Sequence, residues 1–194
     1  MFGGHAVNIS FAQNERKSVT LTSTERRGQG IHSHLLGILT KMKDSFRTIG
    51  LAGTTVGVLD GTAAVVVAGL RGVPPDRVFQ YISSGLLGRS SYEGGAATVI
   101  LGVILHFIVA FGAATIFVLL ARSLGFIRKN PLILGPLYGI AVYFFMSEVV
   151  VALSNVTRQP RTLSGTVTGI LIHIFFVGLP IALITSHSPQ PMST

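Results

Sequence analysis

Residues 96–121, with the sequence AATVILGVILHFIVAFGAATIFVLLA, contain a single charged or histidine side chain, that of His106. About 20 consecutive apolar residues are enough for a helix to cross a lipid bilayer, so this stretch predicts a transmembrane helix. Three other stretches have the same character, and they occupy residues 49–70, 131–155 and 163–185. Their only charged or histidine side chains are, in that order, Asp60, Glu148 and His173. The sequence therefore predicts an all-α membrane protein with four spans.

The composition of the chain favours a membrane protein without a separate soluble domain. Of its 194 residues, 48% are hydrophobic and only 11% are charged, and the mean hydropathy is +0.62. Soluble domains contain about 25% charged residues, and here the deficit is concentrated in the four spans. The chain has no cysteine, which excludes disulfides, thiolate metal sites and cysteine nucleophiles.

The net charge of +8 is interpreted as a signal of membrane topology. Seven of the 15 Lys and Arg residues precede the first span, and such basic flanks usually stay in the cytoplasm and attract anionic lipid. With four spans, both termini are then expected to be cytoplasmic. The sequence has no basic helix interleaved with aromatic residues and no nucleic-acid motif, so the lipid bilayer, and no nucleic acid, is the expected partner.

The segment before the first span, residues 1–45, is predicted to be a disordered basic tail, because it is polar and has no sustained hydrophobic period. It lacks the apolar segment of a secretory signal. A second interpretation is that translation starts at Met42, directly before the first span. Residues 46–187 are expected to form the transmembrane domain, and residues 188–194 a short tail.

The connections between the spans predict an antiparallel bundle. After the first span, two prolines and an aspartate favour the start of a short helix over residues 75–88. One face of this helix is apolar, and it consists of Val78, Phe79, Ile82, Leu86 and Leu87. The helix would lie in the membrane interface or pack on the bundle as an ordinary loop helix. The connections at 122–130 and 156–162 are short, which makes neighbouring spans antiparallel.

Glycines in the spans predict close packing between helices, because small residues let helix backbones approach closely in lipid. They are Gly53, Gly57 and Gly61 in the first span, Gly135 and Gly139 in the third, and Gly102 and Gly169 in the second and fourth. Gly102 and Gly169 each precede a histidine by four residues, so the first two spans resemble the last two. Two such hairpins in the same orientation would be a parallel repeat, as found in some transporters.

The ionisable residues inside the spans are the candidate functional residues. A carboxylate at the centre of a membrane helix costs about 2.5–3.5 kcal/mol on insertion scales, so Asp60 is expected to face the bundle interior or a wet cavity. His106 and His173 would form interhelical hydrogen bonds, a proton relay, a metal site or a bis-histidine haem site. No His-x-x-His or Glu-x-x-His pair is present and no haem signature is found, so no metal and no cofactor is predicted.

Glu148 is the fourth ionisable residue inside a predicted span. Glu148 would be a neutral acid at membrane depth or the ion-pair partner of an arginine in the following connection, Arg158 or Arg161.

The sequence has no P-loop, dinucleotide fingerprint, Gly-x-Ser-x-Gly elbow or His-Glu-x-x-His, which disfavours an enzyme.

Residues 70–88, LRGVPPDRVFQYISSGLLG, resemble the signature of a family of small uncharacterised bacterial inner-membrane proteins with four spans. Residues 102–106, 137–146 and 173–180 resemble its other blocks. The resemblance extends from about residue 42 to residue 186. It implies a four-span fold in the inner membrane of a bacterium, and it transfers no catalytic residue. More distantly, the layout is similar to the YagU-like inner-membrane proteins, which are associated with acid resistance.

Two functional hypotheses follow. In the first, the protein is a small transporter, channel or proton-handling protein whose ionisable residues line an intramembrane polar site. Because four helices form only a thin pathway, this hypothesis predicts a homo-oligomer. In the second, the protein is a non-catalytic membrane scaffold or accessory subunit, and the same residues are structural hydrogen-bonding groups.

Overall fold

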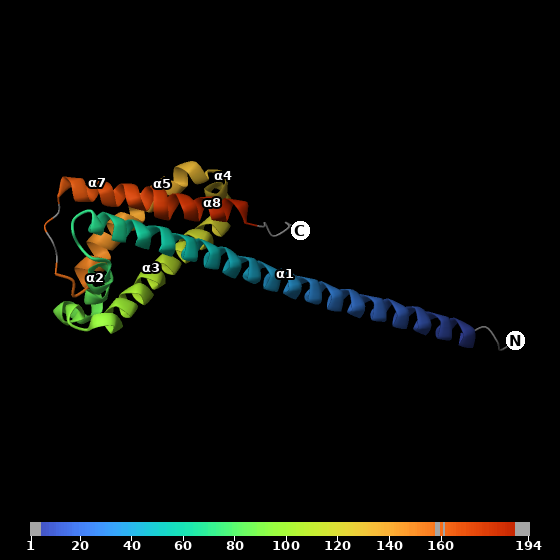
Figure 1. Ribbon diagram of the computed structural model, residues 1–194. Helices are drawn as coiled ribbons and strands as arrows, with labels where there is room; N and C mark the ends of the chain where they lie inside the picture. Colours follow the sequence, from blue (N-terminus) through green and yellow to red (C-terminus); the bar gives the residue numbers. More distant parts are fainter. Residues whose placement is uncertain (1–4, 158–159, 161, 189–194) are drawn as a thin grey trace. The chain divides into compact units, whose positions relative to one another are not determined.

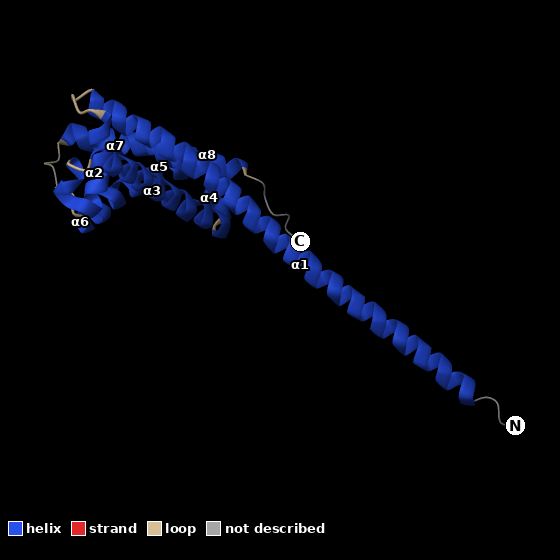
Figure 2. Ribbon diagram, turned by 60° about the horizontal axis from the view of Figure 1, so that its bottom comes forward, coloured by secondary structure: helices blue, strands red, loops and turns tan. Residues whose placement is uncertain are grey.

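The computed structural model describes residues 5–157, 160 and 162–188, and over these residues the regular structure is entirely helical (Figure 2). The chain divides into two compact units, residues 1–44 with 190–194 and residues 45–189.

Helix α1, His5–Gly69, runs through the first unit into the second (Figure 1). The helical backbone from His5 differs from the disordered tail that the sequence predicts over residues 1–45. A helix is costly to nucleate and easy to extend, so an apolar span can propagate helical structure into the polar residues before it. The part of α1 that is long and apolar enough to cross a membrane is His34–Gly69.

The second unit contains the rest of the regular structure. After the last part of α1, its elements are α2 (Pro75–Leu87), a 3-10 turn η1 (Gly88–Tyr92), α3 (Gly95–Ser123), α4 (Gly125–Lys129), α5 (Pro131–Phe144), a π-helical turn η2 (Phe145–Val150), α6 (Val151–Leu153), α7 (Leu163–Ile172), a second π-helical turn η3 (His173–Gly178) and α8 (Leu179–His187). The elements α5 to α6 form one continuous helix, as do α7 to α8.

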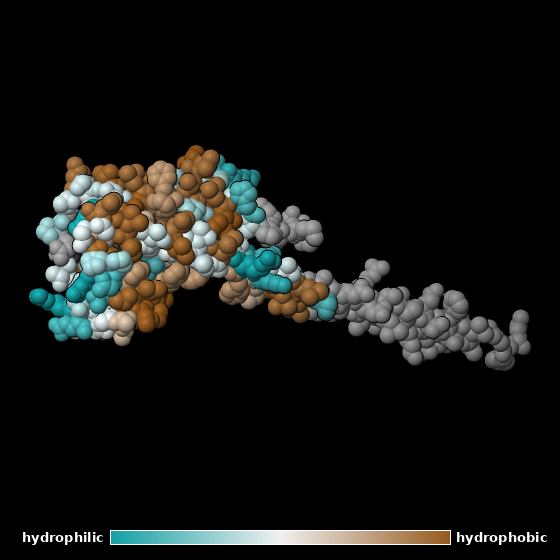
Figure 3. Space-filling view, viewed as in Figure 1, coloured by the Kyte–Doolittle hydropathy of each residue, from teal (hydrophilic) through white to brown (hydrophobic). Residues whose placement is uncertain are grey.

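Four helices in the described residues are long and apolar enough to span a membrane: His34–Gly69, Gly95–Ser123, Pro131–Leu153 and Leu163–His187. They agree with the four predicted spans and pack side by side with alternating direction (Figure 1). On the face that Figure 3 shows, hydrophobic residues cover the middle of this bundle, and hydrophilic residues gather at the end with α2 and at the end with α4. The chain is therefore a multi-pass membrane protein.

Helix α2 packs against α3 through small polar residues. Its buried residues are Gln80, Ser83 and Ser84, whereas Leu86 and Leu87 are exposed. The predicted helix is confirmed, and of its two interpretations the structure has the one in which the helix packs on the bundle. The other apolar residues of the helix, Val78, Phe79 and Ile82, are half-buried. Gly88, with φ of 60°, ends the helix in a conformation that favours glycine.

The third and fourth spans each contain one π-helical turn, η2 and η3. Pro180 lies two residues after the end of η3, and because proline lacks an N–H and crowds the preceding turn, it loosens the helix there. Wide turns of this kind occur frequently at functional sites.

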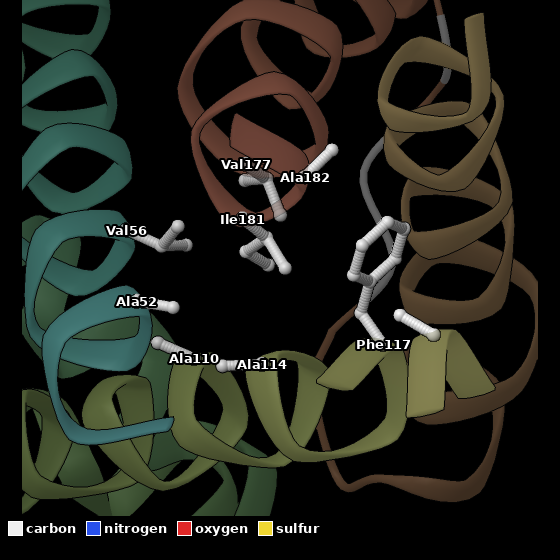
Figure 4. Close-up of a cluster of buried hydrophobic side chains, with 9 residues drawn as sticks. Ala52, Val56, Ala110, Ala114, Phe117, Val177, Ile181 and Ala182 are labelled. Atoms are coloured by element: carbon white, nitrogen blue, oxygen red, sulfur yellow. The ribbon is translucent and has the colours of Figure 1, made fainter. Parts of the chain in front are cut away.

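The buried core consists of small and medium apolar side chains from three spans (Figure 4). The residues are Ala52 and Val56 from α1, Ala110, Ala114, Phe117 and Ala121 from α3, and Val177, Ile181 and Ala182 from η3 and α8. Alanine and valine allow close helix contact, which is the main source of packing energy between helices in lipid. This core fills the half of the bundle nearer to α4.

Candidate functional site

A cavity of about 220 Å³ brings together three of the four predicted site residues. Asp60 of α1, His106 of α3 and His173 of η3 all line it, together with Ile82 of α2. Val56, Ala110 and Val177 belong both to the cavity wall and to the buried core. The cavity therefore begins where the core ends, and it lies on the side of the core toward α2.

Equivalent positions of the two hairpins contribute most of the cavity wall. When the first span is aligned with the third so that Gly57 corresponds to Gly139, Asp60 corresponds to Val142 and Ala64 corresponds to Met146. When the second span is aligned with the fourth so that the two histidines correspond, Ala110 corresponds to Val177. All of these residues except the two glycines line the cavity. Thus residues at corresponding sequence positions of the two hairpins line the cavity, and Asp60 has an apolar counterpart.

His106 connects the first two spans. Its Nε2 atom lies 2.9 Å from the backbone carbonyl oxygen of Gly57. Because a carbonyl oxygen only accepts hydrogen bonds, Nε2 must be the donor and therefore carries a proton. In the neutral imidazole, Nδ1 is then the atom with a free lone pair. A Cβ atom added at Gly61 would lie 3.0 Å from His106 Nε2, so a glycine there leaves room for the ring.

His173 forms its hydrogen bond within its own helix. Its Nδ1 atom lies 2.9 Å from the carbonyl oxygen of Gly169, one turn earlier. By the same reasoning Nδ1 carries the proton, and in the neutral ring the lone pair is on Nε2. The ring also makes an edge contact with Tyr143, at 5.4 Å between centroids. Each histidine therefore has one ring nitrogen held by a backbone carbonyl and a second nitrogen that can exchange a proton.

The Asp60 carboxylate is half-buried, and within the described part of the chain it forms no hydrogen bond or ion pair. The rest of the cavity wall is apolar except for the two histidines. A carboxylate in such surroundings needs a proton, water or a cation to compensate its charge. Asp60 is thus the group at which the cavity would hold a positive charge.

The described residues contain no group of three or more His, Asp or Glu side chains that could hold a metal ion. Asp60, His106 and His173 consequently share a cavity without forming a ligand set. Glu148 lies apart from them, with an exposed side chain in η2, and does not line the cavity. Its predicted partners Arg158 and Arg161 lie outside the described residues.

The seven predicted packing glycines all lie against neighbouring elements. In the first hairpin, side-chain rings meet the glycines of α1: Phe111 at Gly53, Phe107 at Gly57 and His106 at Gly61. Gly102 meets the backbone of α2, and Gly169 meets the ring of Tyr143.

In the second hairpin, the approach is backbone to backbone. Gly135 lies against Gly178 and Leu179, and Gly139 lies against the backbone of His173. Gly178, which has no counterpart in the glycine pattern of the other spans, lies against the backbone of Gly135 and Gly139. The two hairpins therefore share a glycine pattern but cross in different ways.

A second cavity, of about 350 Å³, lies next to the first and is lined by α3, α5 and η2. The two cavities have four wall residues in common: Val109, Ala113, Val142 and Met146. Among the residues that line the second cavity, only Tyr138 has a side-chain hydroxyl. This hydroxyl donates a hydrogen bond to the carbonyl oxygen of Ala113 at 2.7 Å. This cavity could not be predicted from the sequence, because its wall consists of ordinary apolar residues.

Comparison with known proteins adds no relative: no family model, no curated protein and no solved structure matches the chain.

Proposed function

We propose that the protein is a small membrane transporter or channel that handles protons or a small cation at the cavity between its two hairpins. The observation that carries this proposal is the convergence of Asp60, His106 and His173 on one cavity inside the bundle. Ionisable residues inside membrane spans are costly, and they commonly mark ion pathways and proton relays.

The histidines support proton transfer because each has one nitrogen anchored and the other available. Histidine titrates near neutral pH, so a ring held in place by its protonated nitrogen can take up and release a second proton at the other. The Asp60 carboxylate would stabilise the imidazolium form electrostatically or accept the proton itself. No covalent step is needed for this activity.

The position of the cavity between two similar hairpins supports a transport role. Binding sites of several transporter folds lie at the interface of internal repeats, and rocking of one repeat against the other exposes the site alternately. Here the apolar core closes the cavity on the side of α4, so passage toward that side requires such a rearrangement.

The cellular location and the orientation of the protein are inferred from its sequence, and they are part of the proposal. We place the protein in the inner membrane of a bacterium, as a member of the four-span family that residues 70–88 resemble, with both termini cytoplasmic. The α4 end then faces the cytoplasm and the α2 end faces outward. A homo-oligomer is expected, because four helices enclose only a narrow pathway.

The test is a flux measurement in proteoliposomes that contain a pH-sensitive dye. The wild type should dissipate an imposed pH gradient faster than protein-free liposomes, and Asp60→Asn should reduce that rate at least tenfold. Asp76→Asn is the matched control, because Asp76 is exposed in the first turn of α2 and does not line the cavity. Equal proton flux in wild-type and empty liposomes from pH 5 to 8 would reject the proton-handling form of the proposal.

The alternative is a scaffold or accessory subunit, and the hydrogen bonds of the two histidines to backbone carbonyls favour it. Such bonds fix helix positions whether or not the other nitrogen exchanges a proton. This alternative predicts that Asp60→Asn and His106→Leu change the free energy of unfolding but leave all fluxes at the level of empty liposomes.

A further inference from the structure

The two neighbouring cavities differ in chemistry and share a wall. The first is lined by Asp60, His106 and His173, and the second is lined almost entirely by apolar side chains. A volume of about 350 Å³ places the second cavity within the usual range for small-molecule pockets. Because four residues border both, the two cavities are direct neighbours.

A difference between the two hairpins accounts for the contrast between the polar and the apolar cavity. Val142 occupies the position in the second hairpin that Asp60 occupies in the first, and Val142 borders both cavities. The polar group is therefore on one side of the shared space and the apolar surface on the other. A ligand with matching ends would have one charged head and one hydrocarbon part.

We propose that the combined cavity binds amphipathic organic cations, with the cationic head at Asp60 and the hydrocarbon part among Ile116, Phe145 and Val150. This inference rests on the proposed function, since it names the substrate class of the same site.

The charges in the wall select the sign of the head group. No Lys or Arg lines either cavity in the described part of the chain, and Asp60 is the only carboxylate that does. While His106 and His173 are neutral, a cation at Asp60 gains a strong electrostatic attraction in low-dielectric surroundings, whereas an anion is repelled. The hydroxyl of Tyr138 already donates to the carbonyl oxygen of Ala113, so the apolar cavity offers no free donor for a polar tail.

The test is equilibrium binding to the full chain in lipid nanodiscs, with radiolabelled octyltrimethylammonium as the probe and empty nanodiscs subtracted. The probe should bind saturably, at least tenfold more tightly than tetramethylammonium, which lacks the tail. Octyl sulfate, which has the opposite charge, should fail to displace it.

Two substitutions test the two ends of the site separately. Asp60→Asn should weaken binding of octyltrimethylammonium at least tenfold, and Asp60→Glu, which keeps the charge, should retain most of it. Gly112→Leu should also weaken binding at least tenfold, because Gly112 lines the apolar cavity and a side chain there would extend into open space. Gly50→Leu is the matched control, since Gly50 also faces open space and lines neither cavity. It should change binding less than twofold.

Equal binding of octyl sulfate, or unchanged binding in Asp60→Asn, would overturn the assignment of the cationic head. Unchanged binding in Gly112→Leu would overturn the assignment of the hydrocarbon part. The outcome is separable from that of the flux test: binding without proton flux leaves this inference standing and rejects the proton-handling form of the proposed function, whereas proton flux without binding does the reverse.

Discussion

The two hairpins of the bundle begin from similar sequences and cross in different ways. In the first, rings of α3 fill the spaces beside the glycines of α1, and His106 donates a hydrogen bond across to Gly57. In the second, Gly139 and Gly178 bring two backbones into direct contact, and His173 bonds to its own helix. The same spacing of glycine and histidine thus supports a side-chain crossing in one hairpin and a backbone crossing in the other.

This difference also concerns the polar site. The first hairpin contributes the carboxylate of Asp60, and the second contributes Val142 at the equivalent position. His173 of the second hairpin also lines the polar cavity, so both hairpins contribute polar side chains, but the only carboxylate in the wall comes from the first hairpin.

The largest expected effect comes from the backbone crossing. A Cβ atom at Gly178 would meet the backbone of Gly135 and Gly139, which cannot move without separating the helices. Gly178→Ala should therefore lower the free energy of unfolding by about 3 kcal/mol, whereas Gly57→Ala should cost about 1 kcal/mol because the ring of Phe107 can turn away. Unfolding by titration with SDS in mixed micelles measures both.

Gly112→Ala is the control for this pair, because a Cβ atom there faces open space, and its effect should stay within about 0.5 kcal/mol. If Gly57→Ala and Gly178→Ala cost the same, the distinction between the two crossings is wrong.

A smaller difference is expected between the two histidines. His106→Leu removes a hydrogen bond between helices and should cost about 1 kcal/mol, within the range measured for such bonds in membrane proteins. His173→Leu should cost less, because the carbonyl oxygen of Gly169 still accepts the backbone N–H of residue 173. The same SDS titration compares them, and a larger loss for His173→Leu would contradict the assigned roles.

Loss of the hydrogen bond between the two hairpins should lower the free energy of unfolding by a still smaller amount. Tyr138 of α5 donates to the carbonyl oxygen of Ala113 in α3, and its ring packs on Phe117 at 4.9 Å between centroids. Tyr138→Phe keeps the ring contact and loses only the hydrogen bond, so the cost should be about 0.6 kcal/mol. Tyr143→Phe is the control and should be neutral, because in the described residues the Tyr143 hydroxyl has no hydrogen bond, only ring contacts. Equal losses in the two variants would remove the Tyr138 bond as a link between the hairpins.

The smallest effect concerns α2, which belongs only to the connection of the first hairpin. Burial raises the pKa of Tyr81 above its ordinary value of 10.0, and the charge of Tyr92 raises it further. The folded state therefore favours the neutral phenol, so the contribution of Tyr81 to stability is complete below pH 10 and is lost as the pH rises through the higher folded pKa. Tyr81→Phe should reduce the fall in stability above pH 10, measured by SDS titration at pH 8 and at alkaline pH. An unchanged alkaline profile would contradict the raised pKa of Tyr81.

The sequence by itself determined the four spans, the short helix between the first two and the packing role of the glycines. Each of these follows from a local property: the length of an apolar run, the residues that start a helix, or the absence of a side chain. The sequence also identified Asp60, His106 and His173 as residues that a membrane helix retains only at a cost.

Only the tertiary structure decided which of these residues meet. Asp60, His106 and His173 come from three different spans, and their convergence depends on how each helix is rotated about its axis, which packing against neighbours sets. The same packing turned the small polar face of α2 inward, left Glu148 outside the site and placed an apolar cavity beside the polar one. In lipid, apolar faces gain little by turning inward, so hydrophobic pattern alone does not fix helix rotation, and contacts between small residues do.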